Sequence, residues 1–360
     1  MNDIRWNLYP HVAASNHARA WVEMQKKLLR APNTIDAYAR GLDDFLSLCQ
    51  RLGIDVESAT KADIASYVED MAHRPHAKLS HPHSAHPSGG LANRTIHLRL
   101  TAIRLFYDFL IEVGLRDSNP VGRGRYTRAT GFHGTRERGL VPRFEQPPWI
   151  PSDEQWITFL DLVLREEPLR NQLMVFISYD GELRRSELLS LNLSDVDFPH
   201  QKITIRPEVA KNRSGRVVFY GDATSDLLCL YMRHRQSLLA VHSGARLGPL
   251  FLSESYRNRG QPLTFEMWNK IVQSIARRAS LPLFSTHTFR HLRLTDLARC
   301  KLELYEIALT AGHKNFKTTL QYIQLSSTEL GQRLRLATKH IDERNKLMLE
   351  RMRIEDDNSK

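Results

Sequence analysis

Residues 311–324 of the 360-residue chain read AGHKNFKTTLQYIQ, and this stretch decides how the second half of the chain is interpreted. It places a Gly-His pair nine residues before Tyr322, with two threonines between them. A phenol is a weak nucleophile near neutral pH, because its unperturbed pKa is about 10. Tyr322 is therefore either a packing residue or a nucleophile that distant parts of the chain activate.

The composition of the chain favours a nucleic acid as its partner. The net charge is +11, and a strongly basic protein attracts polyanions. A membrane surface is the competing partner, but the arginines are dispersed rather than gathered on one amphipathic helix. The sequence shows neither a bilayer-spanning apolar run nor a signal peptide. Because the three cysteines are scattered, we expect a cytoplasmic protein without a disulfide framework or a zinc finger.

The length of the chain predicts two domains, of which the first, residues 1–113, is expected to be helical. In its last helix, apolar residues recur at a spacing of three or four and predict a buried face. Basic and polar residues follow another face, which is either an ordinary solvated surface or a DNA contact. Its candidate DNA-binding residues are Arg94, His97, Thr101 and Arg104. The predicted helices are 15–30, 34–51, 61–72 and 93–113, with Asn33 or Thr34 as the N-cap of the second.

Two segments rich in glycine, proline and polar residues interrupt this pattern. Residues 73–90 contain five histidines, but their spacing matches no structural zinc site, so a flexible loop is favoured over a metal site. Residues 114–150 are expected to be a basic linker, which is either a disordered connector or a strap along a phosphate backbone. Its candidate DNA-binding residues are Arg123, Arg125 and Arg128.

The second domain, residues 151–326, is predicted to be mainly helical with one β hairpin. The hairpin strands are KITIRPE and RVVFYG, which the turn AKNRSG joins. Ser152 is expected to cap the first helix. Residues 327–360 are predicted to form a helical tail that packs on its own domain or docks on a neighbouring subunit. The helices of the domain are predicted at 152–166, 169–179, 185–190, 224–240, 264–279, 288–299 and 303–311.

Three signals in this domain bring cationic and imidazole groups together. Arg184 stands at a predicted helix start with Glu187 three residues later, a spacing that more often marks a surface pair. Lys211 lies at the hairpin tip, where simple solvation is the ordinary role of a lysine. The stretch STHTFRHLRLTDL holds three basic groups that repel one another unless an anion lies between them: His287, Arg290 and His291.

Together these groups predict a site for a phosphodiester. Two arginines can bind its non-bridging oxygens and counter the charge of the transition state, while lysine and histidine transfer protons. Tyr322 would be the nucleophile, activated less by a nearby base than by cationic surroundings that favour the phenolate. No carboxylate cluster suited to Mg²⁺ stands beside these groups in the sequence, so we expect neither a metal nor another cofactor.

The order Arg…Lys…His-x-x-Arg…Gly-His…Tyr resembles the tyrosine recombinase (phage integrase) family, which includes Xer-type and Cre-type enzymes. LRRSELLSL is similar to the first box of the family, HTFRH to the second, and AGHKNFKTTLQYIQ to the box that carries the tyrosine. NTIDAYARGLDDFLSLC and NRTIHLRLTAIRLFYDFLIEVGLRDSNPV resemble its SAM-like core-binding domain. The likeness covers about residues 20–326 and implies a clamp of a helical domain and a mixed α/β catalytic domain.

The resemblance assigns the phosphate and the nucleophile. Arg184 and Arg290 would hold the scissile phosphate, and Tyr322 would form a 3′-phosphotyrosyl bond. Glu187 would orient the first arginine rather than react. Family members usually carry glycine two residues before that arginine, where this chain has Glu182.

The resemblance also assigns the proton transfers. Lys211 would protonate the 5′-oxygen leaving group, and His287 would act as an acid-base group or as a phosphate ligand. His313 would be a further hydrogen-bond donor to the phosphate. Ala311 replaces the leucine that usually precedes the Gly-His pair.

These assignments imply a site-specific recombinase of double-stranded DNA, with a dimer on each recombination site and a tetramer on two duplexes. It would be associated with the bacterial nucleoid, without a small-molecule substrate or a membrane partner. A type IB topoisomerase, which uses similar chemistry as a monomer, and a DNA-binding protein with a decayed site are the alternatives. The biological role is expected to be that of a Xer-like resolvase or of the recombinase of a mobile element.

Overall fold

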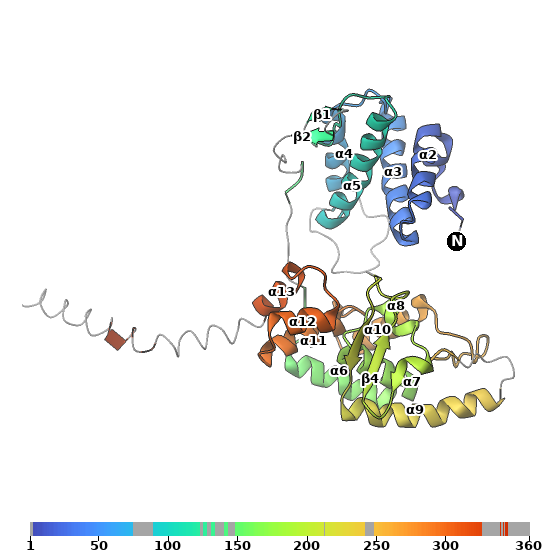
Figure 1. Cartoon of the computed structure of the whole chain (residues 1–360), viewed down its shortest axis with the longest axis vertical. Coiled ribbons are helices and arrows are strands. Elements are labelled where there is room, and N and C mark those ends of the chain that lie inside the picture. The colour runs from blue at the N-terminus through green and yellow to red at the C-terminus, as the bar shows by residue number, and fades with distance from the viewer. Residues whose placement is uncertain are drawn as a thin grey trace, which may run out of the picture. The chain divides into compact units, whose positions relative to one another are not determined.

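The computed structural model of the chain describes residues 3–74, 89–122, 125–127, 131–133, 140–142, 148–211, 213–241 and 248–325, with residues 339, 341, 343 and 344. The chain divides into two compact units, Met1–Gln146 and Pro147–Lys360. Both consist mainly of α-helices with a few short strands, which confirms the predicted fold class (Figure 1). No helix within these ranges is long and apolar enough to cross a bilayer. The predicted tail, 327–360, lies outside the described residues except at those four positions.

The first unit is a helical bundle in which α3 and α5 lie side by side (Figure 1). The apolar face predicted for α5 is confirmed, because Ile96, Leu100, Ile103, Tyr107 and Leu110 are all buried. Trp21 and Phe45 of the neighbouring helices pack in the same core. The elements are η1 (Trp6–Leu8), α1 (Pro10–Ala14), α2 (Asn16–Lys27), α3 (Pro32–Leu52), α4 (Lys61–His73) and α5 (Asn93–Glu112).

The start of α3 differs from the prediction. Its N-cap is Ala31, which makes no side-chain capping bond, and Pro32 occupies the first helical turn. The prediction of Asn33 or Thr34 as the cap is therefore wrong. Proline has the φ angle of a helix already set and lacks one of the N–H groups that have no partner at a helix start, so the helix can begin two residues earlier than a polar cap suggests.

Parts of the two polar segments belong to the first unit. The ends of the 73–90 segment meet, because the Gly90 N–H donates to the Arg74 carbonyl at 3.0 Å; residues 75–88 and the loop predicted there lie outside the described residues. Within the expected linker, β1 (Arg125–Thr127) pairs antiparallel with β2 (Gly131–His133). Val121 is buried in the helical core. A short hairpin thus occupies part of the segment for which a disordered connector or an extended strap was expected.

The second unit surrounds a core of stacked aromatic rings. Phe159 and Phe284 stack with ring centroids 4.3 Å apart, and Phe289 meets Phe284 edge to face. Ser152 caps α6 as predicted, since its Oγ accepts the Gln155 N–H at 3.3 Å. The helices are α6 (Asp153–Glu166), α7 (Leu169–Asp180), α8 (Arg185–Leu189), η2 (Leu193–Asp195), α9 (Asp222–Val241), α10 (Phe265–Arg278), α11 (Thr288–Arg299), α12 (Leu304–Ala311) and α13 (Lys317–Leu325).

A small antiparallel sheet carries the predicted hairpin. Its order is β3 (Val196–Asp197), β4 (Lys202–Ile205) and β5 (Arg216–Phe219), so the hairpin is confirmed and a two-residue third strand was missed. Arg216 lies opposite Ile205 in the register, and side chains at paired positions share one face of a sheet. Because Ile205 is buried, the register turns Arg216 towards the interior of the unit.

Candidate active site

Glu187 is the anchor of the first arginine. Its side chain is 0% exposed, and Oε1 accepts from Arg184 Nη1 at 2.9 Å while Oε2 accepts the Arg184 N–H at 2.9 Å. Arg216 reaches the same carboxylate from β5, at 3.0 Å from Oε1 and 2.8 Å from Oε2. Burial alone would raise the pKa of Glu187, but the hydrogen bonds and charges of the two arginines lower it to about 2. Glu187 therefore stays ionised and is hydrogen-bonded to Arg184, the arginine that it is predicted to orient.

The neighbouring arginine, Arg185, does not share this environment. Its side chain is exposed, with the guanidinium over the ring of Phe265 at 5.6 Å from the centroid. The turn before α8 explains why Arg184 and not Arg185 faces the site. In this turn Glu182 has a φ of 50°, in the left-handed region that favours glycine. The backbone thus takes a glycine-like turn although the residue is a glutamate, and Arg184 faces the site.

Arg290 lies in the first turn of α11 and is buried. Its Nη1 donates to the Glu182 carbonyl at 2.7 Å, and its Nη2 donates to the Ala311 carbonyl. Its Nη2 also lies 2.9 Å from His313 Nε2. Burial lowers the pKa of Arg290 to about 10, with further contributions from the charges of Arg184 and Arg216. Arg290 remains a cation at neutral pH and joins the turn before α8 to the end of α12.

The turn at Gly312 places His313 next to Arg290. Gly312 ends α12 with a φ of 63°, a conformation in which a Cβ is strained, and a Cβ there would also meet Arg216 Cδ at 3.2 Å. The reversed chain brings His313 Nδ1 to 2.9 Å from Thr319 Oγ1. A guanidinium can only donate, so His313 Nε2 accepts from Arg290 and the ring proton is on Nδ1.

His313 is consequently a neutral acceptor from Arg290 in this structure, and its donation to a phosphate stays a prediction. Burial lowers its pKa to about 4, and the charges of Arg290, Arg184 and Arg216 act in the same direction. A phosphate that took the Arg290 donors would break the Arg290–His313 bond. His313 must then turn or change its tautomer before it can donate to the same phosphate.

Tyr322 lies on α13, packed against α11 and α12, and it is 2% exposed. Its hydroxyl is 2.9 Å from His291 Nδ1, and its ring stacks on His313 at 6.2 Å between centroids. Burial raises the pKa of Tyr322, although the charges of Arg290 and Arg184 lower it. The expectation that cationic surroundings dominate is therefore wrong for the free protein, because burial outweighs them and an imidazole stands beside the nucleophile.

His287 and Lys211 are the two exposed members of the predicted set. His287 is the N-cap residue of α11, and Lys211 occupies the turn between β4 and β5. Desolvation lowers the pKa of His287, and the charges of Arg290, Arg185, Arg184 and Lys211 lower it further. The charge of the lysine thus acts on this imidazole, and both side chains are accessible from solvent.

The charge of the cluster suits an anion. Arg184, Arg216 and Arg290 face the ionised carboxylate of Glu187, and the excess positive charge attracts a phosphate. Among the residues that the structure describes, no group of three or more His, Cys, Asp or Glu side chains forms a metal-binding set. The arrangement supports phosphoryl transfer to a tyrosine with guanidinium groups as the electrophilic element.

The predicted DNA-binding face of α5 is only partly exposed. Arg94 is exposed, whereas Arg104 is half-buried. His97 Nε2 lies 3.3 Å from the Pro142 carbonyl, and Thr101 Oγ1 donates to the His97 carbonyl at 2.8 Å. Arg125 lies in β1, and Arg123 and Arg128 lie outside the described residues. Arg94 is therefore the member of the α5 set that is most open to a partner.

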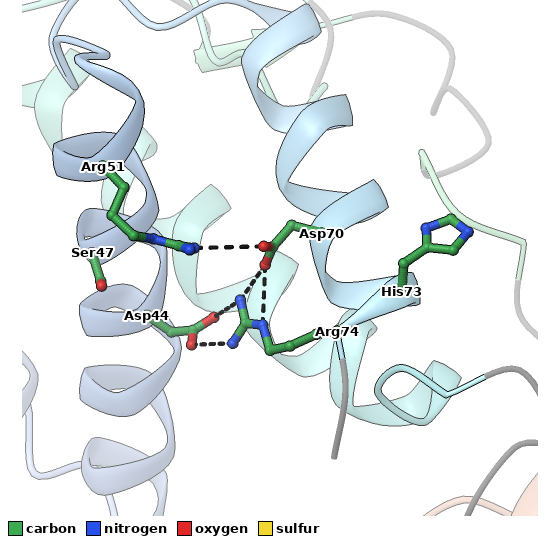
Figure 2. A pocket seen from close by; sticks show the side chains of 6 residues that line it. All are labelled: Asp44, Ser47, Arg51, Asp70, His73 and Arg74. Carbon is green, nitrogen blue, oxygen red and sulfur yellow. Dashed lines mark hydrogen bonds and ion pairs between the residues drawn. The ribbon is translucent and has the colours of Figure 1, made fainter. Parts of the chain in front are cut away.

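The first unit also contains a hollow lined by charged side chains between α3 and α4 (Figure 2). Arg74 Nη1 contacts Asp44 at 2.6 Å, and Arg74 Nη2 pairs with Asp70. Arg51 lies 3.5 Å from Asp70, and Arg99, a residue of α5, pairs with Asp44. The acidic and basic groups of the hollow compensate one another, so it ties three helices together and holds none of the predicted catalytic residues.

Two site residues were not among the predicted catalytic set. Arg216 stands 29 positions from Glu187 in the sequence, and the register of β5 alone brings them together. His291 was noticed beside Arg290 but received no role, because its contact with Tyr322 depends on how α13 packs against α11. The one available signal was its spacing of four residues from His287, which is one helical turn.

The fold agrees with comparisons with known proteins. Residues 153–329 match the phage integrase family, and residues 23–114 match the phage integrase N-terminal SAM-like domain. The chain belongs to the phage integrase family, whose enzymes are tyrosine recombinases.

Similar proteins span most of the chain. Tyrosine recombinase XerC of Leptospira interrogans is 25% identical over 310 residues, covering 86% of this chain and 88% of that protein. XerC of Roseiflexus sp. strain RS-1 is 26% identical over 312 residues, covering 85% and 87%. The Tn1549 transposon integrase, solved with transposon right end DNA, has a TM-score of 0.62 and 14% identity, covering 88% of this chain and 100% of that one. XerH bound to its difH substrate has a TM-score of 0.58 and 18% identity, covering 88% and 90%.

Proposed function

We propose that this tyrosine recombinase cuts and rejoins double-stranded DNA at a specific site through a covalent 3′-phosphotyrosyl bond at Tyr322. The observation that carries the proposal is the convergence of Arg184, Arg290 and His313 on the surroundings of Tyr322. The chain is also strongly basic, with a net charge of +11. Relatives and structural neighbours are named as recombinases, and several of the neighbours are complexes with DNA.

The proposed chemistry uses the cations in place of a metal. Arg184 and Arg290 bind the non-bridging oxygens of the scissile phosphate, and Glu187 together with Arg216 holds the first of them in place. Lys211 protonates the 5′-oxygen as it leaves. Because the phosphotyrosyl bond conserves the energy of the broken phosphodiester, rejoining needs no nucleotide cofactor.

We further propose that a dimer assembles on each recombination site and a tetramer on two duplexes, in the cytoplasm at the nucleoid. The XerC relatives favour a Xer-like resolvase, and the Tn1549 neighbour favours the recombinase of a mobile element. The sequence of the DNA next to the gene distinguishes the two roles. Element ends there support the recombinase of a mobile element, and a pair of half-sites without element ends supports the resolvase. Multi-angle light scattering with and without the site measures the assembly.

A covalent-trapping experiment tests the proposed function. The bound site is first selected from a random duplex library, and a suicide duplex nicked beside the expected cleavage position is then incubated with the protein. A recombinase accumulates a covalent complex on this duplex and not on a scrambled one. Relaxation of any supercoiled plasmid supports a type IB topoisomerase instead, and DNA binding without an adduct supports a protein that only binds.

A further inference from the structure

Two imidazoles flank the buried phenol of Tyr322, and they differ in the nitrogen that each can offer. His313 stacks on the phenol ring at an angle of 8°, but its Nε2 is engaged by Arg290 and its Nδ1 by Thr319. His291 instead directs Nδ1 to the phenolic oxygen at 2.9 Å, with ring centroids 5.8 Å apart. Of the two, His291 is the imidazole in contact with the oxygen that would attack phosphorus.

The surroundings keep both members of this pair neutral in the free protein. Desolvation lowers the pKa of His291 to about 4, and the charges of His287 and Arg290 act in the same direction. Burial raises the pKa of Tyr322, so its hydroxyl keeps its proton at neutral pH. The titratable and charged groups facing His291 are His287 at the N-cap of α11, Arg290 on α11, Tyr322 on α13, and His313 before α13. A neutral imidazole has one nitrogen with a free lone pair, which can accept the phenolic proton.

His287, the histidine that the family resemblance connects with acid-base chemistry, lies elsewhere in the site. It precedes α11 by one position and is exposed, and the charge of Lys211 contributes to lowering its pKa. Among the contacts of the described residues, His287 makes none with Tyr322, whereas His291, one helical turn deeper, does. His287 thus lies on the side of the proposed leaving-group acid and His291 on the side of the nucleophile.

We propose that His291 is the general base of the cleavage step, a role that rests on the proposed phosphotyrosyl chemistry. The O–H bond of Tyr322 breaks and the proton passes to His291 Nδ1, while the phenolic oxygen bonds to phosphorus. The bond between phosphorus and the 5′-oxygen then breaks, and that oxygen takes a proton from Lys211. Rejoining runs the transfers in reverse, so His291 returns the proton to Tyr322. The negative charge of the bound phosphate raises the proton affinity of His291 when it is needed.

Single-turnover cleavage of the suicide duplex tests this role with the full-length protein. His291→Asn keeps a polar atom near the position of Nδ1 but cannot take up a proton. We expect its cleavage rate at pH 7 to fall about 100-fold, a typical contribution of a general base, with unchanged binding of the duplex. Although burial raises the pKa of Tyr322, the fraction of phenolate grows as the pH rises, so the deficit shrinks with increasing pH. His234→Asn, a change at a histidine of α9 that pairs with Glu254, is the matched control and keeps the wild-type rate.

An unchanged or faster rate in His291→Asn overturns the proposal, because it shows a hydrogen bond that only holds the tyrosine. A deficit of the same size at every pH also overturns it, since a positioning bond does not depend on ionisation of the phenol. If His291→Asn unfolds at the assay temperature, His291→Gln is used with the same criteria. A wild-type adduct without an effect at His291 refutes this inference alone, whereas absence of the adduct from wild type refutes the proposed function.

Discussion

Arg216 Nη2 lies 2.8 Å from Glu187 Oε2, and this contact joins the hairpin to the first arginine of the site. Arg216 Nε also donates to the Thr310 carbonyl at 2.8 Å, next to the Gly-His turn. One side chain therefore connects β5, α8 and the end of α12. Arg216 thus acts on the position of Arg184 through Glu187. Among the contacts of the described residues, Arg216 makes none with Tyr322 or His291.

The Arg216–Glu187 pair is expected to be strongly coupled. Arg216→Met leaves a buried carboxylate with one cationic partner, and removing one member of a buried ion pair costs about 3–5 kcal/mol. Glu187→Gln in the same background removes the charge that has lost this partner. We predict that the double variant loses about 2 kcal/mol less than the sum of the single losses, as measured by urea unfolding. Additive losses would show that the pair does not act as a unit.

The low pKa of Glu187 predicts a stability change in acid. Its pKa of about 2 in the folded protein lies below the ordinary value of 4.5, so its contribution is complete above pH 4.5 and is lost as the pH falls through 2. The contribution amounts to about 3 kcal/mol at neutral pH. The unfolding free energy of wild type should therefore fall more steeply than that of Glu187→Gln between pH 4.5 and 2. Parallel curves for the two proteins contradict this assignment.

Glu182 predicts the opposite dependence. Burial raises its pKa from 4.5 to about 7, although Arg290, Arg293 and Arg216 oppose the shift. The folded state then prefers the protonated acid, so stability is complete below pH 4.5 and is lost as the pH rises through 7. Glu182→Gln should match wild type at pH 4 and exceed it by at most about 3 kcal/mol at pH 8. The comparison is made by thermal or urea unfolding, and a variant that is less stable at pH 8 refutes it.

The role of Lys211 predicts rescue by a better leaving group. Lys211→Ala should slow cleavage of an ordinary suicide duplex about 100-fold, because an alkoxide needs a proton to leave. A duplex with sulfur at the 5′-bridging position should be cleaved within about 3-fold of the wild-type rate, since a thiolate leaves unprotonated at a pKa of about 8.5. Arg213→Ala changes another exposed cation of the same turn and is the control. Its cleavage rate relative to wild type should be the same on both duplexes. Equal losses on both duplexes exclude Lys211 as the acid.

Much of the helical framework could be predicted from the sequence, because amphipathic periodicity is a local property. The buried face of α5 and the Ser152 cap of α6 were both predicted from a few neighbouring residues. The start of α3 could not, since a proline in the first turn replaces the polar cap that the prediction sought. The hairpin of β1 and β2 was also missed, because glycine and arginine between short strands are equally typical of a linker.

The parts of the candidate site that lie within one turn of the chain could be predicted from the sequence. The contacts that form only when distant elements pack together could not. Arg184 and Glu187 are three positions apart, and Gly312 needs its left-handed φ to present His313. The Arg216–Glu187 contact needs the β4–β5 register, and the His291–Tyr322 contact spans 31 positions between two helices. Burial of the phenol, which reverses the expected direction of its pKa shift, likewise depends on the packing of α13.

The most direct test of the account is the identity of the bond in the trapped complex. The covalent complex with the suicide duplex is digested with protease and nuclease, and the peptide that carries the nucleotide is sequenced by mass spectrometry. We predict a phosphodiester between the Tyr322 hydroxyl and the 3′ end of the cut strand, and no adduct in Tyr322→Phe, which still binds the duplex. A nucleotide on another residue, attachment to the 5′ end, or an adduct that persists in Tyr322→Phe would contradict the central claim.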